Sequence, residues 1–182
     1  MDDELGAVAE LARNFFAKEV TPHQRRFAEQ GLPDKEVYGT LGRLGLSGMS
    51  IPTEFGGGGG TFAHDAVLFH EQVMAGDHSL QLGVHSGIVP HYLNAYGSYE
   101  QKSRWLPKLT SGEWVGAIAM TEPGTGSDLQ NITTKPCATG VTMSSPAPRP
   151  SSPTVATVTS SSSRPRPMPR SGRRECLSLS PR

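Results

Sequence analysis

The chain has 182 residues, and its 17 basic and 17 acidic side chains give a formal charge of zero. No run of about 18 apolar residues is present, which excludes a membrane-spanning helix, and the cysteines Cys137 and Cys176 make neither a disulfide framework nor a zinc pattern. The neutral total hides two unlike parts, because residues 1–135 carry a net charge of −6 and residues 136–182 a net charge of +6.

Five helices are predicted in chain order from apolar side chains that recur every three or four residues. The expected ranges are 5–20, 33–45, 61–73, 80–93 and 98–107. The apolar stripes of the first three are formed by Leu5, Val8, Leu11, Phe15, Phe16 and Val20; by Val37, Leu41 and Leu44; and by Phe62, Ala66, Phe69 and Val73. The Phe15–Phe16 pair is therefore assigned to the core.

Prolines and capping residues set the helix boundaries. Thr21–Pro22 is expected to end the first helix, because a residue before proline disfavours the helical conformation. Pro90 must kink or interrupt the fourth helix. Ser98 to Gln101 has the spacing of a capping box and opens the fifth helix, with Pro107 near its end.

Three local features have ordinary structural explanations. The run Gly56–Gly60 lacks the Lys-Ser/Thr of a phosphate-binding loop and follows no strand, so a flexible connector is predicted. The Arg25–Arg26 pair is expected on a solvated face. No carboxylate or cysteine recurs at ligand spacing beside the helical histidines, so no metal site is predicted. We expect ordinary surface or partly buried positions for His64, His70, His78 and His85.

One segment has a pattern that a purely structural turn does not require. Trp114 to Met120 reads as a short buried strand, and the string TEPGTGSD follows it at Thr121–Asp128. Gly124 and Gly126 allow a close backbone approach to a ligand, and Thr121 and Ser127 offer hydroxyl groups. This set suits a flat heteroaromatic ring with a polar tail.

With this motif the sequence resembles the acyl-CoA dehydrogenase family, whose signature is a strand followed by TEPGxGSD. Further matches come in the family's order: LGLSGM at 44–49, PTEFGG at 52–57, GSYEQK at 97–102 and LPKL at 106–109. The resemblance covers about residues 5 to 135, and the wording around Met120 is most similar to the long-chain-type branch.

The resemblance implies a mainly α fold with three parts. Residues 1–112 would form an N-terminal helical domain, and residues 113–135 the start of a middle β-barrel domain that is incomplete here. Residues 136–182 are Pro-, Ser- and Arg-rich and are expected to form a disordered tail. Members of the family continue with a C-terminal four-helix bundle and assemble as homotetramers.

The resemblance also implies FAD as cofactor and an acyl-CoA substrate, which is converted to a trans-2-enoyl-CoA. Ile118, Met120 and Thr121 would line the flavin ring, and Gly126 and Ser127 would continue the flavin contact. Ser127 would also touch the acyl-CoA chain. The acceptor of the electrons would be an electron-transfer flavoprotein.

No catalytic residue is assigned within these 182 residues. Glu122 is not the family's base, which is expected in the missing C-terminal domain. Acyl chain length stays open, because the pocket for the chain depends largely on helices of that domain.

The tail suggests a shifted reading frame. The codons of the tail can be inferred from its amino acids and translated in a shifted reading frame. In that frame the junction Met168–Pro169 must encode alanine. Permitted codons elsewhere yield a continuation that resembles the family and includes a second flavin segment, F-I-T-N-G. We therefore predict a frameshift near the Lys135 codon in a G/C-rich, bacterial gene. The chain as written is then expected to bind FAD poorly and to be inactive.

An alternative from another class is a non-catalytic helical interaction module with a basic disordered arm. Seven arginines in the tail could contact an acidic partner, but the tail has no aromatic residue and no lysine, so nucleic acid is not predicted as a partner. The acidic start Met1–Glu4 opposes a secretory or transit segment. A bacterial cytoplasmic location is expected, in preference to the mitochondrial matrix.

Overall fold

The structure is a computed structural model that describes residues 3–118, 127, 137–139, 142–145 and 177–178. The chain divides into two units, Met1–Gly116 and Ala117–Arg182. The first unit is helical, so the expectation of a mainly α chain is confirmed.

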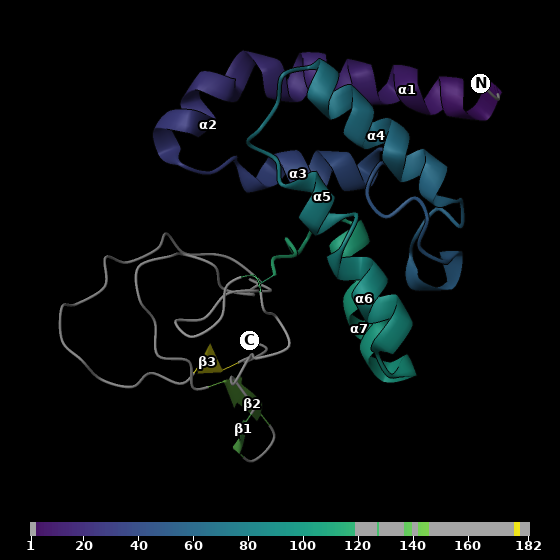
Figure 1. Ribbon diagram of the computed structural model, residues 1–182, viewed down its shortest axis with the longest axis vertical. Coiled ribbons are helices and arrows are strands. Elements are labelled where there is room, and N and C mark those ends of the chain that lie inside the picture. The colour runs from purple at the N-terminus through teal and green to yellow at the C-terminus, as the bar shows by residue number, and fades with distance from the viewer. Residues whose placement is uncertain (1–2, 119–126, 128–136, 140–141, 146–176, 179–182) are drawn as a thin grey trace. The chain divides into compact units, whose positions relative to one another are not determined.

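Seven α-helices and three short helices of other types form the described part of the first unit. In chain order they are α1 (Asp3–Phe15), the π-helix η1 (Phe16–Val20), the 3-10 helix η2 (Thr21–His23), α2 (Gln24–Gln30), α3 (Lys35–Arg43), the 3-10 helix η3 (Thr53–Phe55), α4 (Phe62–Met74), α5 (Leu82–His85), α6 (Val89–Tyr96) and α7 (Tyr99–Thr110). Figure 1 shows α1 and α4 side by side and α6 paired with α7.

The apolar side chains gather in two clusters. The larger cluster joins α1, α2, α3, α4 and α5, and the smaller one joins the η3 turn to α7, with α6 packed against it. Their fully buried members are Ala12, Phe16, Val20, Phe27, Leu41, Leu46, Leu68 and Leu82 in the first, and Ile51, Leu106 and Leu109 in the second. Phe15 and Phe16 are both buried, which confirms their assignment to the core.

The predicted boundary at Thr21–Pro22 is found as a change of helix type, because η1 ends at Val20 and η2 begins at Thr21, but the helical path does not stop there. Thr21 keeps helical dihedral angles, with φ of −54° and ψ of −43°, and Pro22 lies in the first turn of η2. A proline is tolerated there because the first turn has no use for its missing N–H. The helical path therefore continues into α2, which the sequence did not predict, and ends at Gly31 with a positive φ of 74°.

Several positions assigned to apolar stripes are exposed instead. The exposed members are Leu11, Leu44, Phe62, Ala66 and Val73. On α4 the buried face carries Asp65, Leu68, Glu71 and Gln72. Polar partners explain this reversal: Arg13 of α1, for example, holds Glu71 through two contacts of 3.1 and 3.0 Å.

The glycine run Gly56–Gly60 is held by backbone hydrogen bonds, which contradicts the prediction of a flexible connector. The amides of Gly58, Gly59 and Gly60 donate to carbonyl oxygens of residues 48–51, with a shortest N–O distance of 2.8 Å. A Cβ on Gly57 would lie 2.1 Å from the carbonyl oxygen of Ile51. The small residue is required by this close approach of two backbone segments.

Two predicted helix boundaries are confirmed. Pro90 interrupts the range 80–93, because it starts α6 after the short helix α5. Ser98 caps α7, where its hydroxyl accepts the Gln101 amide at 3.2 Å and the Gln101 side chain accepts the Ser98 amide at 2.9 Å. Pro107 lies inside α7, in its last turns.

The predicted strand from Trp114 to Met120 is not found over residues 114–118. Within them only Val115 takes part in β pairing, as an isolated bridge, and residues 119–120 lie outside the described residues.

The second unit contains three short strands among its described residues. β1 (Cys137–Thr139), β2 (Thr142–Ser145) and β3 (Leu177–Ser178) form an antiparallel sheet in the order β1-β2-β3. Ala138 is opposite Met143, and Ser144 is opposite Ser178. The range for which a disordered tail was predicted contributes these strands and otherwise lies outside the described residues.

Candidate functional site

The predicted site residues are only partly within the described structure. Ile118 is half-buried and Ser127 is exposed. Met120, Thr121 and Gly126 lie outside the described residues. The described residues 114–116 show how the chain approaches these positions.

Residues 114–116 lead towards the motif and are held at three points. The Trp114 amide donates to the carbonyl oxygen of Lys108 at 2.9 Å. The Val115 side chain packs against the larger core cluster. The Gly116 amide donates to Nδ1 of His85 at 3.1 Å. Each contact comes from a different part of the helical unit, so the path of this segment is closely determined.

Of these three contacts, the hydrogen bond from Gly116 to His85 was the least expected from the sequence. His85 lies at the end of α5 and is fully buried, so the prediction of a surface or partly buried histidine is wrong for this residue. The Tyr38 ring meets the imidazole edge to face at 5.1 Å. Nε2 of His85 lies 3.4 Å from the Ser47 hydroxyl, and this hydroxyl lies 3.5 Å from the carbonyl oxygen of Leu109.

These contacts determine the protonation state of His85. A backbone N–H can only donate, so Nδ1 must be unprotonated, and the single proton of the neutral ring resides on Nε2. Burial lowers the pKa of His85 to about 4, because the charged form loses its hydration. Burial also raises the pKa of Tyr38 to about 12, so the neighbouring phenol stays neutral.

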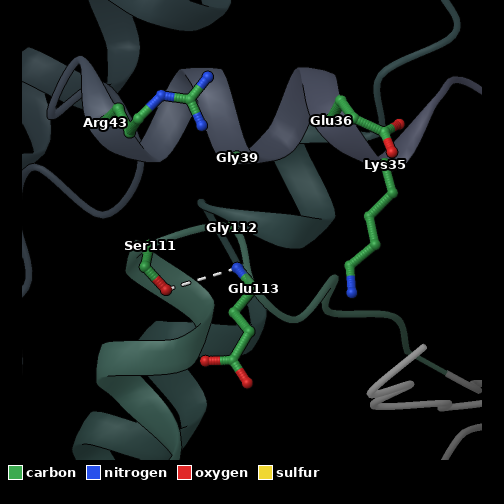
Figure 2. Close-up of a pocket in the computed structure, with 7 residues that line it drawn as sticks. All are labelled: Lys35, Glu36, Gly39, Arg43, Ser111, Gly112 and Glu113. Carbon is green, nitrogen blue, oxygen red and sulfur yellow. Dashed lines mark hydrogen bonds between the residues drawn. The ribbon is translucent and has the colours of Figure 1, made fainter. Parts of the chain in front are cut away.

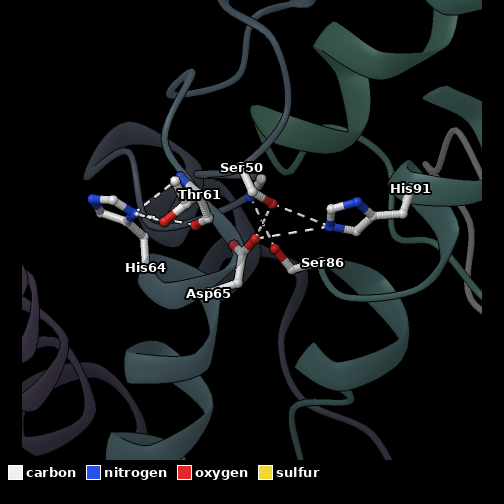
Figure 3. A network of polar contacts seen from close by, with 7 residues as sticks. Ser50, Thr61, His64, Asp65, Ser86 and His91 are labelled. Atoms are coloured by element: carbon white, nitrogen blue, oxygen red, sulfur yellow. Dashed lines mark hydrogen bonds and ion pairs between the residues drawn. The ribbon is translucent and has the colours of Figure 1, made fainter. Parts of the chain in front are cut away.

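A second buried polar network joins the loop before η3 to α4 and α6 (Figure 3). The Ser50 hydroxyl donates to Asp65, which is fully buried. The Ser50 oxygen lies 3.1 Å from Nε2 of His91, and because its one proton goes to Asp65, it accepts from His91. Among the described residues, none donates to Asp65 Oδ1. The network connects three elements and lacks the serine–histidine–carboxylate relay of a hydrolase.

The neighbouring Ser86 has a separate role. Its buried hydroxyl accepts the Gly48 amide at 2.8 Å. Gly48 has a positive φ of 65°, which the hydrogen bond helps to maintain. Ser86 thus ties the end of α5 to the turn that precedes the glycine run.

A surface groove lies between α3 and the end of α7 (Figure 2). It is lined by Lys35, Glu36, Gly39, Arg43, Ser111, Gly112 and Glu113. The lining carries two basic and two acidic side chains, so it favours no particular charge. The Glu113 amide contacts the Ser111 hydroxyl at 3.4 Å. The arrangement of these residues does not indicate a catalytic or binding site.

The described residues contain neither a metal-binding cluster nor a membrane-spanning helix. Nowhere in them do three or more metal-binding side chains gather in a group that could hold an ion. None of their helices combines the length and apolar character that crossing a bilayer requires.

Comparison with known proteins identifies the family. The profile of the family described as "Acyl-CoA dehydrogenase, N-terminal domain" matches residues 2–113, which is more than half of the chain. The chain belongs to the acyl-CoA dehydrogenase family.

Relatives agree in sequence and in fold. The mitochondrial long-chain specific acyl-CoA dehydrogenase of Mus musculus is 41% identical over 125 residues, which are 69% of this chain and 29% of that protein. An acyl-CoA dehydrogenase from Geobacillus kaustophilus superimposes with a TM-score of 0.74 at 33% identity, covering 81% of this chain and 39% of the other. An acyl-CoA dehydrogenase from Bacillus anthracis, solved in complex with FAD, gives a TM-score of 0.73 at 31% identity, covering 81% and 26%.

The match covers only part of the length of these relatives. The chain spans about 29% of the length of the mouse protein.

Proposed function

We propose that this chain is the N-terminal part of an FAD-dependent acyl-CoA dehydrogenase, which oxidises an acyl-CoA thioester to a trans-2-enoyl-CoA. The observation that carries the proposal is the position of the TEPGTGSD string at 121–128, directly after the 2–113 match to the family's helical domain. The relative from Bacillus anthracis that was solved with FAD supports the choice of cofactor.

The residue types of the motif suit a flavin. Ile118 and Met120 offer apolar faces for a flat ring, and Thr121 and Ser127 offer hydroxyl groups for its polar edge. Gly126 leaves its backbone N–H accessible. We assign these five residues to FAD, and Ser127 also to the acyl-CoA chain. The exposure of Ser127 leaves its hydroxyl available for such contacts.

The division of labour follows from the cofactor. When bound, FAD supplies the redox chemistry by accepting the hydride from the β-carbon. The residues of this chain would bind and orient the flavin and the thioester. The base that removes the α-proton is proposed to lie in the C-terminal domain, outside these 182 residues. Glu122 is not assigned that role.

The finer assignments are proposals from the same family relationship. The domains are proposed at 1–112 and 113–135, followed by a frameshifted tail at 136–182. A long-chain substrate is supported by the 41% identity to the mouse long-chain enzyme. An electron-transfer flavoprotein would accept the electrons. The full-length enzyme would be a homotetramer, located in the cytoplasm of a bacterium.

A polypeptide of only these 182 residues is proposed to be inactive. It would lack the second flavin segment, the bundle and the base, and unpaired strand edges of a partial barrel favour aggregation.

The test compares two proteins. One is the 182-residue polypeptide, and the other is the product of the gene after a one-base correction near the Lys135 codon. The corrected protein should purify with FAD, and its flavin absorbance should bleach when a long-chain acyl-CoA is added without oxygen. The 182-residue polypeptide should do neither. A corrected protein that takes up no FAD would contradict the proposed function, and bleaching by the short polypeptide would contradict its inactivity.

A further inference from the structure

The segment that enters the flavin motif begins at a buried histidine. Gly116 is the last residue of the helical unit and stands two residues before Ile118, the first residue assigned to the flavin. Its amide is held by His85 Nδ1 at 3.1 Å, and no other partner of that amide is found among the described residues. His85 therefore controls the point at which the chain leaves the helices.

The surroundings of Gly116 allow little adjustment. Gly116 is buried, and a Cβ at this position would lie 3.1 Å from Cβ and Cγ1 of Val89 in α6. The backbone is thus enclosed by α6 on one side and by the imidazole on another. If the hydrogen bond were lost, a buried N–H would be left without a partner, and such a group is costly.

The imidazole is itself held in one orientation. Tyr38 packs edge-on against it, and Ser47 stands at its far nitrogen. The proton on Nε2 points to Ser47, which leaves Nδ1 as a permanent acceptor for Gly116. Protonation of Nδ1 would set two donors against each other, so the anchor requires the neutral ring.

We propose that His85 is a positioning residue for the flavin segment: its unprotonated Nδ1 fixes the Gly116 amide and with it the backbone that continues through Ile118 into the motif. This assignment rests on the proposed function for its purpose, and on the described geometry for the anchor itself. His85 touches neither cofactor nor substrate in this account and acts only through the backbone of Gly116.

Two substitutions at the same position separate anchoring from simple core filling. In His85→Asn the amide oxygen can occupy the place of Nδ1 and still accept from Gly116. In His85→Gln the longer side chain reaches the place of Nε2 near Ser47 but leaves Gly116 without a partner. Both variants remove the ring and create similar loss of packing, so a role limited to packing predicts similar effects.

The measurement is amide hydrogen exchange by NMR on the 182-residue chain. The Trp114 amide serves as internal reference, because its bond to Lys108 does not involve His85. The ratio of the Gly116 rate to the Trp114 rate should rise by about tenfold to a hundredfold in His85→Gln and stay within about threefold of the parent value in His85→Asn. The amide signals of Ala117 and Ile118 should shift in His85→Gln and remain in place in His85→Asn.

Equal ratios in the two variants would overturn the proposal, as would unmoved Ala117 and Ile118 signals in His85→Gln. If either variant fails to fold, the parent chain still gives a decision. Imidazole nitrogen shifts must then report a neutral Nε2–H ring for His85 at neutral pH, and an Nδ1–H ring would refute the anchor. None of these readouts needs flavin, so a failure to bind FAD contradicts the proposed function alone.

Discussion

At the scale of single residues, two buried polar side chains each accept a hydrogen bond from one backbone amide. His85 and Ser86 are adjacent and both fully buried, yet each holds a different backbone amide, that of Gly116 and that of Gly48. An unpaired buried amide costs about 1–3 kcal/mol. These two side chains therefore contribute to stability through the backbone groups that they satisfy.

His85 predicts a loss of stability in mild acid. Its pKa is about 4 in the folded chain and about 6.5 when unfolded. Between these values the unfolded state binds more protons, so stability falls as the pH drops below about 6.5 and levels off below about 4. From neutral pH to about pH 5 the loss should be about 2 kcal/mol. Urea unfolding at both pH values measures it.

The matched control for this pH dependence is His85→Asn, which cannot titrate at that position. Over the same pH range the variant should lose less stability than the parent. The difference between the two losses should be about the contribution of the His85 imidazole. The same pH dependence in parent and variant would show that His85 is not the group responsible.

Ser86 predicts a cost that does not depend on pH. The substitution Ser86→Ala leaves the Gly48 amide buried without its acceptor, so the free energy of unfolding should fall by about 1–3 kcal/mol. Ser103→Ala is the control, since Ser103 is exposed on α7, and it should stay within about 0.5 kcal/mol of the parent. Urea unfolding compares the two. A Ser86→Ala chain as stable as the parent would mean that Gly48 finds another acceptor.

At the scale of elements, α3 crosses the end of α7 at very short range. A Cβ on Gly42 would lie 2.2 Å from the carbonyl oxygen of Ser111, whereas a Cβ on Gly39, one turn away, would meet only the Arg43 side chain at 3.5 Å. Gly42 is therefore needed for the crossing, and Gly39 is not.

This pair gives a prediction with opposite signs in one helix. Gly42→Ala should destabilise the chain by about 1–3 kcal/mol, because the backbones must move apart. Gly39→Ala should stabilise it by about 0.5–1 kcal/mol through the better helix propensity of alanine. Thermal unfolding of both variants provides the measurement. Similar effects of the two substitutions would refute the close crossing.

The helices could be predicted from the sequence where local signals decide. The Ser98–Gln101 capping box and the break at Pro90 depend on neighbouring residues, and both are confirmed. The buried face of α4 depends on partners distant in the sequence: Arg13 for Glu71, and Ser50 for Asp65. Hydrophobic periodicity carries no information about such pairs, so it assigned Phe62 and Val73 to the wrong side.

In the candidate site, too, only the features that depend on neighbouring residues could be predicted. The motif at 121–128 could be recognised because its residues are contiguous. The anchor at His85 could not, because Gly116 is 31 positions away in the chain. One local signal did exist, since His85 stands inside the apolar run from Leu80 to Leu93. A histidine inside an apolar run indicates a specific acceptor or donor.

At the scale of the whole molecule, the central proposal concerns the reading frame that follows the helical domain. The helical domain matches its family over 2–113, while the chain spans about 29% of the length of the mouse relative. The composition changes after Lys135, where the net charge turns from −6 to +6. We propose that a shifted reading frame explains this change in composition.

The most direct test is to sequence the genomic DNA from the Gly126 codon to several hundred bases beyond Arg182 and to translate all three frames. We predict that one alternative frame encodes a second flavin segment, a helical bundle and a carboxylate base. If no frame encodes them, the frameshift is refuted and the basic tail is a genuine arm, so the interaction-module alternative must then be tested.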